Sequence, residues 1–148
     1  MADDADAQPP PNPTPPAPPA AAPPPARPDR DIGYLVDMLE NVRRAIEHVA
    51  GRDWAAFQAD RVLQDAVAHR LLIVGEAVRN VSQATRLQLP GIPWRNVNAM
   101  RNILVHDYKG VELKYVWEVI GRHGPEMVRL IQAYLDARNV RPDPTGPA

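Results

Sequence analysis

The segment RNILVHDY, residues 101–108, contains residue types that could act on a phosphodiester. The imidazole of His106 can give and take a proton near neutral pH. The guanidinium of Arg101 can bind two phosphate oxygens and stabilise the negative charge that develops on them during attack. RNA carries its own nucleophile, the 2′-hydroxyl, so an Arg and a His are sufficient in principle for metal-free strand cleavage. The neighbouring Asn102 could orient the phosphate or the ribose.

The spacing of these residues does not place them on one face of a helix. Five positions separate Arg101 from His106, which corresponds to about 140° around a regular helix. Tyr108 lies about 200° further round and falls at or beyond the helix end expected before Gly110. A site therefore requires an irregular helix end, the long reach of the Arg side chain, or a second copy of the segment across a dimer.

Glu76 is a second unusual residue, because it interrupts the apolar segment LLIVGEAV at residues 71–78. A carboxylate buried in such a helix needs a partner, so we expect an ion pair between Glu76 and an Arg. Local metal ligation is not indicated, since the four histidines are far apart in the sequence and no HExxH motif occurs.

The first thirty residues differ in composition from the rest of the chain, because they contain twelve of its 18 prolines. Proline fixes φ and removes a backbone donor, and no apolar periodicity accompanies it here. We therefore predict a disordered or polyproline-II tail over residues 1–30, without the features of a secretory signal.

Charge and cysteine content set broad limits on function. The tail holds four acidic and two basic residues, which leaves 15 basic and 14 acidic residues beyond it. Such a near-neutral domain does not indicate nucleic-acid binding by bulk charge. The absence of cysteine excludes disulfides and thiolate zinc sites, and it agrees with a reducing cytoplasm. No apolar segment approaches membrane-spanning length.

Apolar residues beyond residue 31 recur at the three-and-four spacing of helices, and no useful stretch alternates with period two. The pattern predicts an all-α, up-and-down bundle of about five helices over residues 31–138, followed by an irregular tail over residues 139–148. Asp53 is a plausible cap for a short helical turn. The predicted helices cover residues 31–49, 60–82, 93–109, 111–120 and 125–138. The third of them begins at Pro93 and ends before Gly110.

Longer segments of the chain resemble a known family. The motif R-x4-H-x-Y at residues 101–108 lies within PWRNVNAMRNILVHDY, residues 93–108. Together with LQDAVAHRLLIVGEA (63–77) and VELKYVWEVI (111–120), it resembles the HepT-type toxins of the HEPN superfamily. The similarity covers roughly residues 31–137 and leaves the proline-rich tail outside.

The resemblance implies a helical homodimer in which two R-x4-H-x-Y motifs face a shared cleft. It implies that Arg101 and His106 form a metal-independent ribonuclease pair without a cofactor, that Asn102 assists them, and that Glu76 supports the site. It also implies an MntA-type nucleotidyltransferase antitoxin, which silences the toxin by transferring AMP to Tyr108.

Two other hypotheses remain open. The chain could be a non-catalytic HEPN partner that binds nucleotide or RNA for a nucleotidyltransferase, as its near-neutral charge would allow. It could also be a purely structural dimerisation bundle, in which case substitution of Arg101 or His106 would leave every phenotype unchanged.

Overall fold

The computed structural model describes residues 28–106 and 113–141, and every regular element within these ranges is a helix. The predicted all-α class is confirmed. Most of the two predicted tails, residues 1–27 and 142–148, lies outside the described residues. The helices in the described ranges are α1 (Pro28–Val49), α2 (Trp54–Ala59), α3 (Arg61–Asn80), α4 (Gln83–Gln88), α5 (Trp94–His106) and α6 (Leu113–Asp136).

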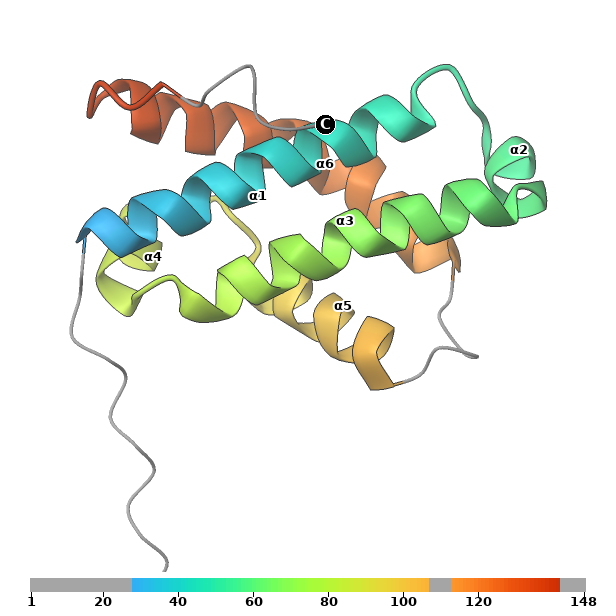
Figure 1. The fold of residues 1–148 in the computed structure, drawn as a ribbon, viewed down its shortest axis with the longest axis horizontal. Coiled ribbons are helices and arrows are strands. Elements are labelled where there is room, and N and C mark those ends of the chain that lie inside the picture. Colours follow the sequence, from blue (N-terminus) through green and yellow to red (C-terminus); the bar gives the residue numbers. More distant parts are fainter. Residues whose placement is uncertain (1–27, 107–112, 142–148) are drawn as a thin grey trace, which may run out of the picture.

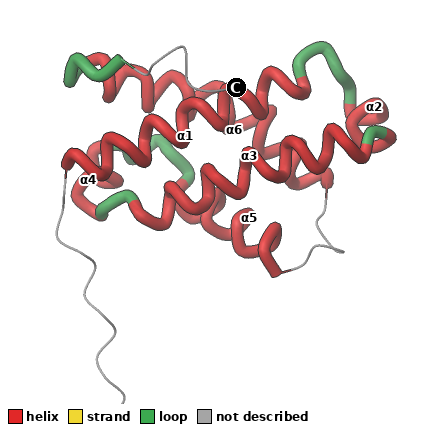
Figure 2. The backbone as a smooth tube through the Cα atoms, in the orientation of Figure 1, coloured by secondary structure: helices red, strands yellow, loops and turns green. Residues whose placement is uncertain are grey.

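The four longer helices form an up-and-down bundle. α1 packs against both α3 and α6, α6 crosses behind α1, and α5 packs against α3, below it in the view of Figure 1. The connections from α1 through to α5 are short (Figure 2). Short connections between long helices favour antiparallel neighbours, which explains the alternating directions of α1, α3, α5 and α6.

α1 begins at Pro28, three residues before the predicted start at Asp31. Proline is favoured at the first position of a helix because its missing N–H would have no partner there. Asp29 and Asp31 add negative charge to the first turn, where the helix dipole stabilises it. The other end agrees with the prediction, since α1 stops at Val49 and Gly51 takes a positive φ of 71°.

Two aspartates start the next two helices. Asp53 accepts a hydrogen bond of 2.8 Å from the Ala56 N–H, and it caps α2 as predicted. Asp60 accepts one of 2.9 Å from the Leu63 N–H and caps α3. Each carboxylate satisfies a backbone donor that has no partner within the helix.

α6 is one continuous helix, so the prediction of two helices separated by Gly121 and Gly124-Pro125 is wrong. Proline removes a backbone donor and commonly ends a helix. Here apolar residues are buried on both sides of Pro125, and packing stabilises the helix across it. Gly124 belongs to that packing, because a Cβ at this position would lie 3.2 Å from Cδ1 of Ile46 on α1.

α4 has no counterpart among the predicted helices. Its N-cap is Ser82, whose hydroxyl also donates to the Asp31 carboxylate at 2.5 Å. The Thr85 hydroxyl donates to the same oxygen at 2.6 Å, and Asp31 is only 4% exposed. α4 is therefore anchored by a contact with the distant start of α1, which no local periodicity encodes.

Asp31 gives the domain a predictable dependence of stability on pH. Burial raises the pKa of this carboxyl, but hydrogen bonds from Ser82 and Thr85, with the charge of Arg86, outweigh it and hold the pKa below its usual value. The resulting stabilisation is fully present above the unfolded-state pKa of about 3.9, and it is lost as the pH falls through the folded-state pKa. We expect Asp31→Ala to lower the free energy of unfolding at neutral pH by about 2 kcal/mol in urea titrations, and by less in acid.

Asp29→Ala is the matched control, because Asp29 is exposed in the same first turn of α1. It removes a comparable interaction with the helix dipole, worth about 0.5 kcal/mol, and no buried hydrogen bond. Equal losses of stability in the two variants at neutral pH would contradict the role given to Asp31.

Candidate active site

α4 and the loop after it fix the point at which α5 begins. Arg86 of α4 donates hydrogen bonds to the carbonyls of Val78 and Val81 at the end of α3, at 2.6 and 3.1 Å. Its guanidinium carbon lies 5.6 Å from the ring centroid of Trp94, the first residue of α5. The Trp94 indole N–H donates to the Leu89 carbonyl at 3.0 Å. The start of α5 is thereby tied to the end of α3.

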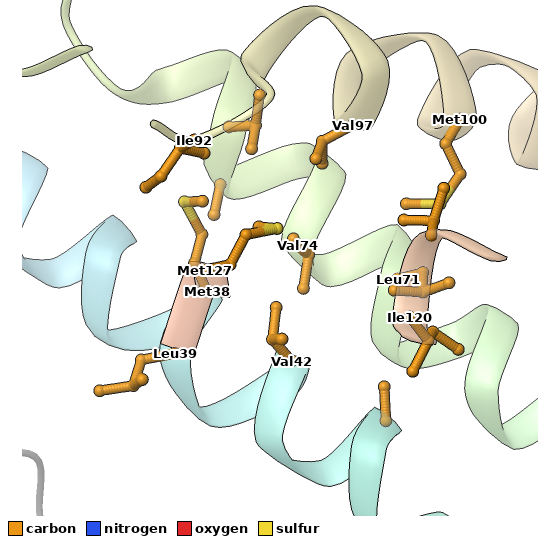
Figure 3. Packing of buried hydrophobic residues seen from close by; sticks show 14 of the residues in the cluster. Met38, Leu39, Val42, Leu71, Val74, Ile92, Val97, Met100, Ile120 and Met127 are labelled. Atoms are coloured by element: carbon orange, nitrogen blue, oxygen red, sulfur yellow. The ribbon is translucent and has the colours of Figure 1, made fainter. Parts of the chain in front are cut away.

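α5 begins one residue after the predicted start at Pro93 and buries a narrow apolar stripe against α3. The stripe consists of Val97, Met100 and Leu104, each at most 4% exposed. Figure 3 shows Val97 and Met100 on the side of α5 that faces Val74 of α3. These positions follow the spacing i, i+3 and i+7, which places them on one side of the helix.

The apolar residues on either side of Leu104 are not part of this stripe. Ile103 is 39% exposed and Val105 is 45% exposed, although both lie within a predicted helix rich in apolar residues. The reason is that, among the described helices, α3 is the one against which α5 packs extensively, and one neighbour covers only one side. The outer side of α5 therefore presents two apolar side chains together with the exposed Asn102.

Gly75 brings the backbone of α3 directly against Arg101 of α5. A Cβ at position 75 would overlap the Cβ of Arg101, and it would lie 2.5 Å from Cγ and 3.5 Å from Cα of that residue. The crossing of the two helices therefore requires glycine at position 75. It holds the base of the Arg101 side chain, of which 15% is exposed.

Glu76, the next residue of α3, holds the guanidinium of Arg101. Its Oε1 accepts a hydrogen bond of 2.7 Å from Nε and a second, shorter one from Nη2. The predicted pairing of Glu76 with an Arg is confirmed. The premise that Glu76 is buried is wrong: half of its side chain is exposed, and its Oε2 lies 3.7 Å from Nη1 of Arg79.

The contacts of Arg101 leave part of its guanidinium available. An arginine side chain has five N–H donors. Glu76 accepts from Nε and Nη2, and the Asn102 side-chain oxygen accepts from Nη1 at 3.2 Å. One donor on each Nη atom has no acceptor among the described residues. Two such donors at the end of a guanidinium match two oxygens of a phosphate group.

The other two motif residues lie at or beyond the end of α5. His106 is the last residue of the helix, and Tyr108 falls outside the described residues together with Gly110. Five positions of helix separate Arg101 from residue 106, which corresponds to about 140°. The structure thus brings together Arg101, Glu76 and Asn102, and α5 alone does not place residues 101 and 106 on one face.

Two residues of this arrangement have no role in the sequence-based predictions. Gly75 positions Arg101, and the signal for it is a lone glycine inside an apolar helix, which often marks a close backbone approach. Arg79 lies next to Glu76, and the signal for it is the i, i+3 spacing of opposite charges on one helix.

Comparison with known proteins shows the family to which the chain belongs. Residues 38–134 match the family model described as "Ribonuclease HepT-like". A protein named "Putative RNase" from Caldanaerobacter subterraneus subsp. tengcongensis is 34% identical over 102 residues, covering 69% of this chain and 91% of the relative. The chain belongs to the HepT-like ribonuclease family.

Two archaeal relatives extend the HepT-like match. A "Putative RNase" of Methanocaldococcus jannaschii is 30% identical over 104 residues, covering 70% of this chain and 95% of the relative. A "Probable ribonuclease HepT" of Thermococcus cleftensis is 32% identical over 94 residues, covering 64% and 86% of the two chains. No solved structure shows significant similarity to the chain.

The HepT-like region contains all of α3 and α5, and with them the whole arrangement around Arg101.

Within residues 28–106 and 113–141, no three His, Asp or Glu side chains gather as metal ligands would. None of the helices described is both long and apolar enough to span a bilayer.

Proposed function

We propose that this HepT-like chain is the toxin of a toxin–antitoxin pair and cleaves RNA internally without a metal ion. The observation that carries the proposal is the Arg101 guanidinium, which Glu76 orients while two donors stay available for a phosphate. Family membership supports RNA as the substrate. Arg101 and His106 are the proposed catalytic pair, Asn102 assists them, and Glu76 is a positioning residue.

The proposed reaction uses the nucleophile that RNA itself carries. The 2′-oxygen attacks the adjacent phosphorus, and the bond from phosphorus to the 5′-oxygen breaks. The products are a 2′,3′-cyclic phosphate and a 5′-hydroxyl. An imidazole takes the proton from the 2′-hydroxyl or supplies one to the departing 5′-oxygen, which is the role of His106. Arg101 binds two non-bridging oxygens and stabilises their charge in the transition state.

A homodimer would complete this site. Ile103 and Val105 leave apolar surface exposed on the outer side of α5, beside the polar Asn102. Apolar surface of this kind favours a protein contact, and a two-fold dimer would bring the same side of a second α5 against it. Arg101 of one protomer and His106 of its partner could then line one cleft, although they lie about 140° apart on a single helix.

Cleavage of RNA by the purified chain in excess EDTA tests the proposal. We expect fragments that end in a 2′,3′-cyclic phosphate, together with growth arrest when the chain is expressed without its antitoxin. A dimeric, folded protein that cleaves no RNA at any concentration would contradict the assignment of a nuclease.

The alternative is a non-catalytic subunit that binds nucleotide or RNA for a nucleotidyltransferase. Its support is the net charge of −1, since a nuclease usually has a stronger basic surface. This alternative predicts a stable complex with the transferase and no cleavage. Family membership favours the nuclease, because the matching family model and the relatives are named as ribonucleases.

Tyr108 is the proposed point of control by an MntA-type nucleotidyltransferase. Transfer of AMP from ATP would join its phenolic oxygen to phosphorus, with pyrophosphate as the leaving group. The added phosphate and adenine would place negative charge where the RNA phosphate must bind. We expect co-expression with an MntA-type nucleotidyltransferase to add AMP to the peptide containing Tyr108, as measured by mass spectrometry, and to suppress RNA cleavage.

Tyr108→Phe should abolish this addition of mass. Tyr115→Phe is the matched control and should retain it, because the Tyr115 hydroxyl lies on α6, 3.4 Å from the Asn96 carbonyl oxygen. An unmodified Tyr108 peptide, recovered while the transferase is active, would rule out this mode of control.

A further inference from the structure

α5 differs in charge from the rest of the protein. It carries two arginines and three asparagines but no acidic residue, whereas the whole chain has a net charge of −1. Arg101 is paired with Glu76, but Arg95 is exposed, and no ion pair among the described residues includes it. The outer side of α5 therefore carries a positive charge that no described acidic side chain offsets.

Arg95 and Asn102 lie in one row along the outer side of α5. Seven positions separate them, which corresponds to about 20° around the helix and about 10 Å along it. Both are exposed, as is the small Ala99 between them, whereas Val97 and Met100 face the core. The backbone position of residue 106 falls in the same row, about 16 Å from that of Arg95.

Arg95 and Arg101 are suited to different phosphates of one strand. Their backbone positions are six residues apart, which is about 9 Å along α5 and about 120° around it, and Glu76 holds the Arg101 side chain at the crossing with α3. A guanidinium binds two oxygens of one phosphate at close range, so each arginine would bind its own phosphate. Around the helix the half-buried Asn98 lies midway between them, so a strand that contacts both arginines must cross α5 obliquely over this residue.

We propose that Arg95 binds a backbone phosphate of single-stranded RNA that flanks the phosphate held by Arg101, so that the strand crosses α5 obliquely. This inference rests on the proposed ribonuclease function and names a substrate-binding residue for it. Single-stranded RNA is the expected form, because in-line attack by the 2′-oxygen requires a strand that can leave regular helical geometry.

Binding of a fluorescent oligoribonucleotide tests the role of Arg95. The His106→Ala background prevents the proposed cleavage during titration. In that background we expect Arg95→Ala to raise Kd about tenfold at low salt. The slope of log K against log salt should become shallower by about 0.7, the contribution of one contact with a single-strand phosphate. Arg95→Lys should keep the salt slope, because it keeps the charge.

Cleavage kinetics give a second readout. With His106 intact, Arg95→Ala should raise KM about tenfold and leave kcat within about twofold, because a flanking phosphate is bound equally in the ground state and the transition state. Arg44→Ala is the matched control: Arg44 is a half-buried arginine on α1, which packs against α3 and α6 (Figure 1). It should leave Kd, the salt slope and KM unchanged.

The outcomes separate this inference from the proposed function. A parent protein that cleaves RNA, with an Arg95→Ala variant of unchanged Kd and salt slope, would overturn the role of Arg95 and leave the ribonuclease standing. A parent that neither binds nor cleaves RNA would overturn both. Dissociation of a dimer by Arg95→Ala, measured by light scattering, would assign the loss of binding to assembly and would also overturn the inference.

Discussion

We expect the His106→Ala variant to cleave RNA about a thousandfold more slowly than the parent protein in excess EDTA. This is the expected result if the imidazole transfers a proton to or from the reacting oxygens. The variant still contains the Arg101 guanidinium held by Glu76, so it should still bind the RNA phosphate. Single-turnover cleavage of end-labelled RNA under saturating protein measures the chemical step separately from binding.

His48→Ala is the control for loss of an imidazole, because His48 lies in the last turn of α1, away from the α3–α5 crossing. It should cleave at the parent rate. Thermal unfolding of His106→Ala should match the parent within a few degrees, since His106 is the final residue of α5 and helix ends contribute little to the core. Parent-like cleavage by His106→Ala would show that the catalytic assignment is wrong.

The sequence predicted those helices whose stability depends on a local apolar stripe. α1, α3 and α5 each bury residues at the three-and-four spacing, and each was expected within a few residues of its observed bounds. The predictions failed where contacts between distant segments override local signals. α4 depends on hydrogen bonds to Asp31, and α6 continues through Pro125 because its buried residues on both sides pack on the core.

The candidate site shows the same division between local and distant information. A carboxylate in the apolar stretch of α3 predicts an arginine partner, but nothing local identifies Arg101 among the arginines of the chain. That choice depends on the crossing of α3 and α5 at Gly75. The exposure of Ile103 was also beyond prediction, because an apolar residue near the core stripe faces solvent only if no second helix covers it.

Gly75→Ala is expected to lower both the stability of the domain and the rate of cleavage. The new methyl group would overlap Cβ of Arg101 and lie 2.5 Å from its Cγ. These atoms lie close to the backbone of α5 and cannot swing aside, so α5 must move away from α3. Overpacking of this kind costs about 1–3 kcal/mol, measured by urea denaturation. The movement also draws the guanidinium away from Glu76, and a displacement of about 1 Å can slow the chemistry about a hundredfold.

Gly33→Ala is the matched control, since Gly33 is exposed on α1 and a Cβ there would meet nothing within 4 Å. It should stabilise the domain by up to about 1 kcal/mol through helix propensity and leave cleavage unchanged. Cleavage is compared well below both unfolding midpoints, so that a loss in Gly75→Ala reports the position of Arg101 and not the unfolded fraction. Reduced stability with full cleavage would show that the close crossing serves packing alone. In that case the rate of cleavage would not depend on the orientation of Arg101 by Glu76.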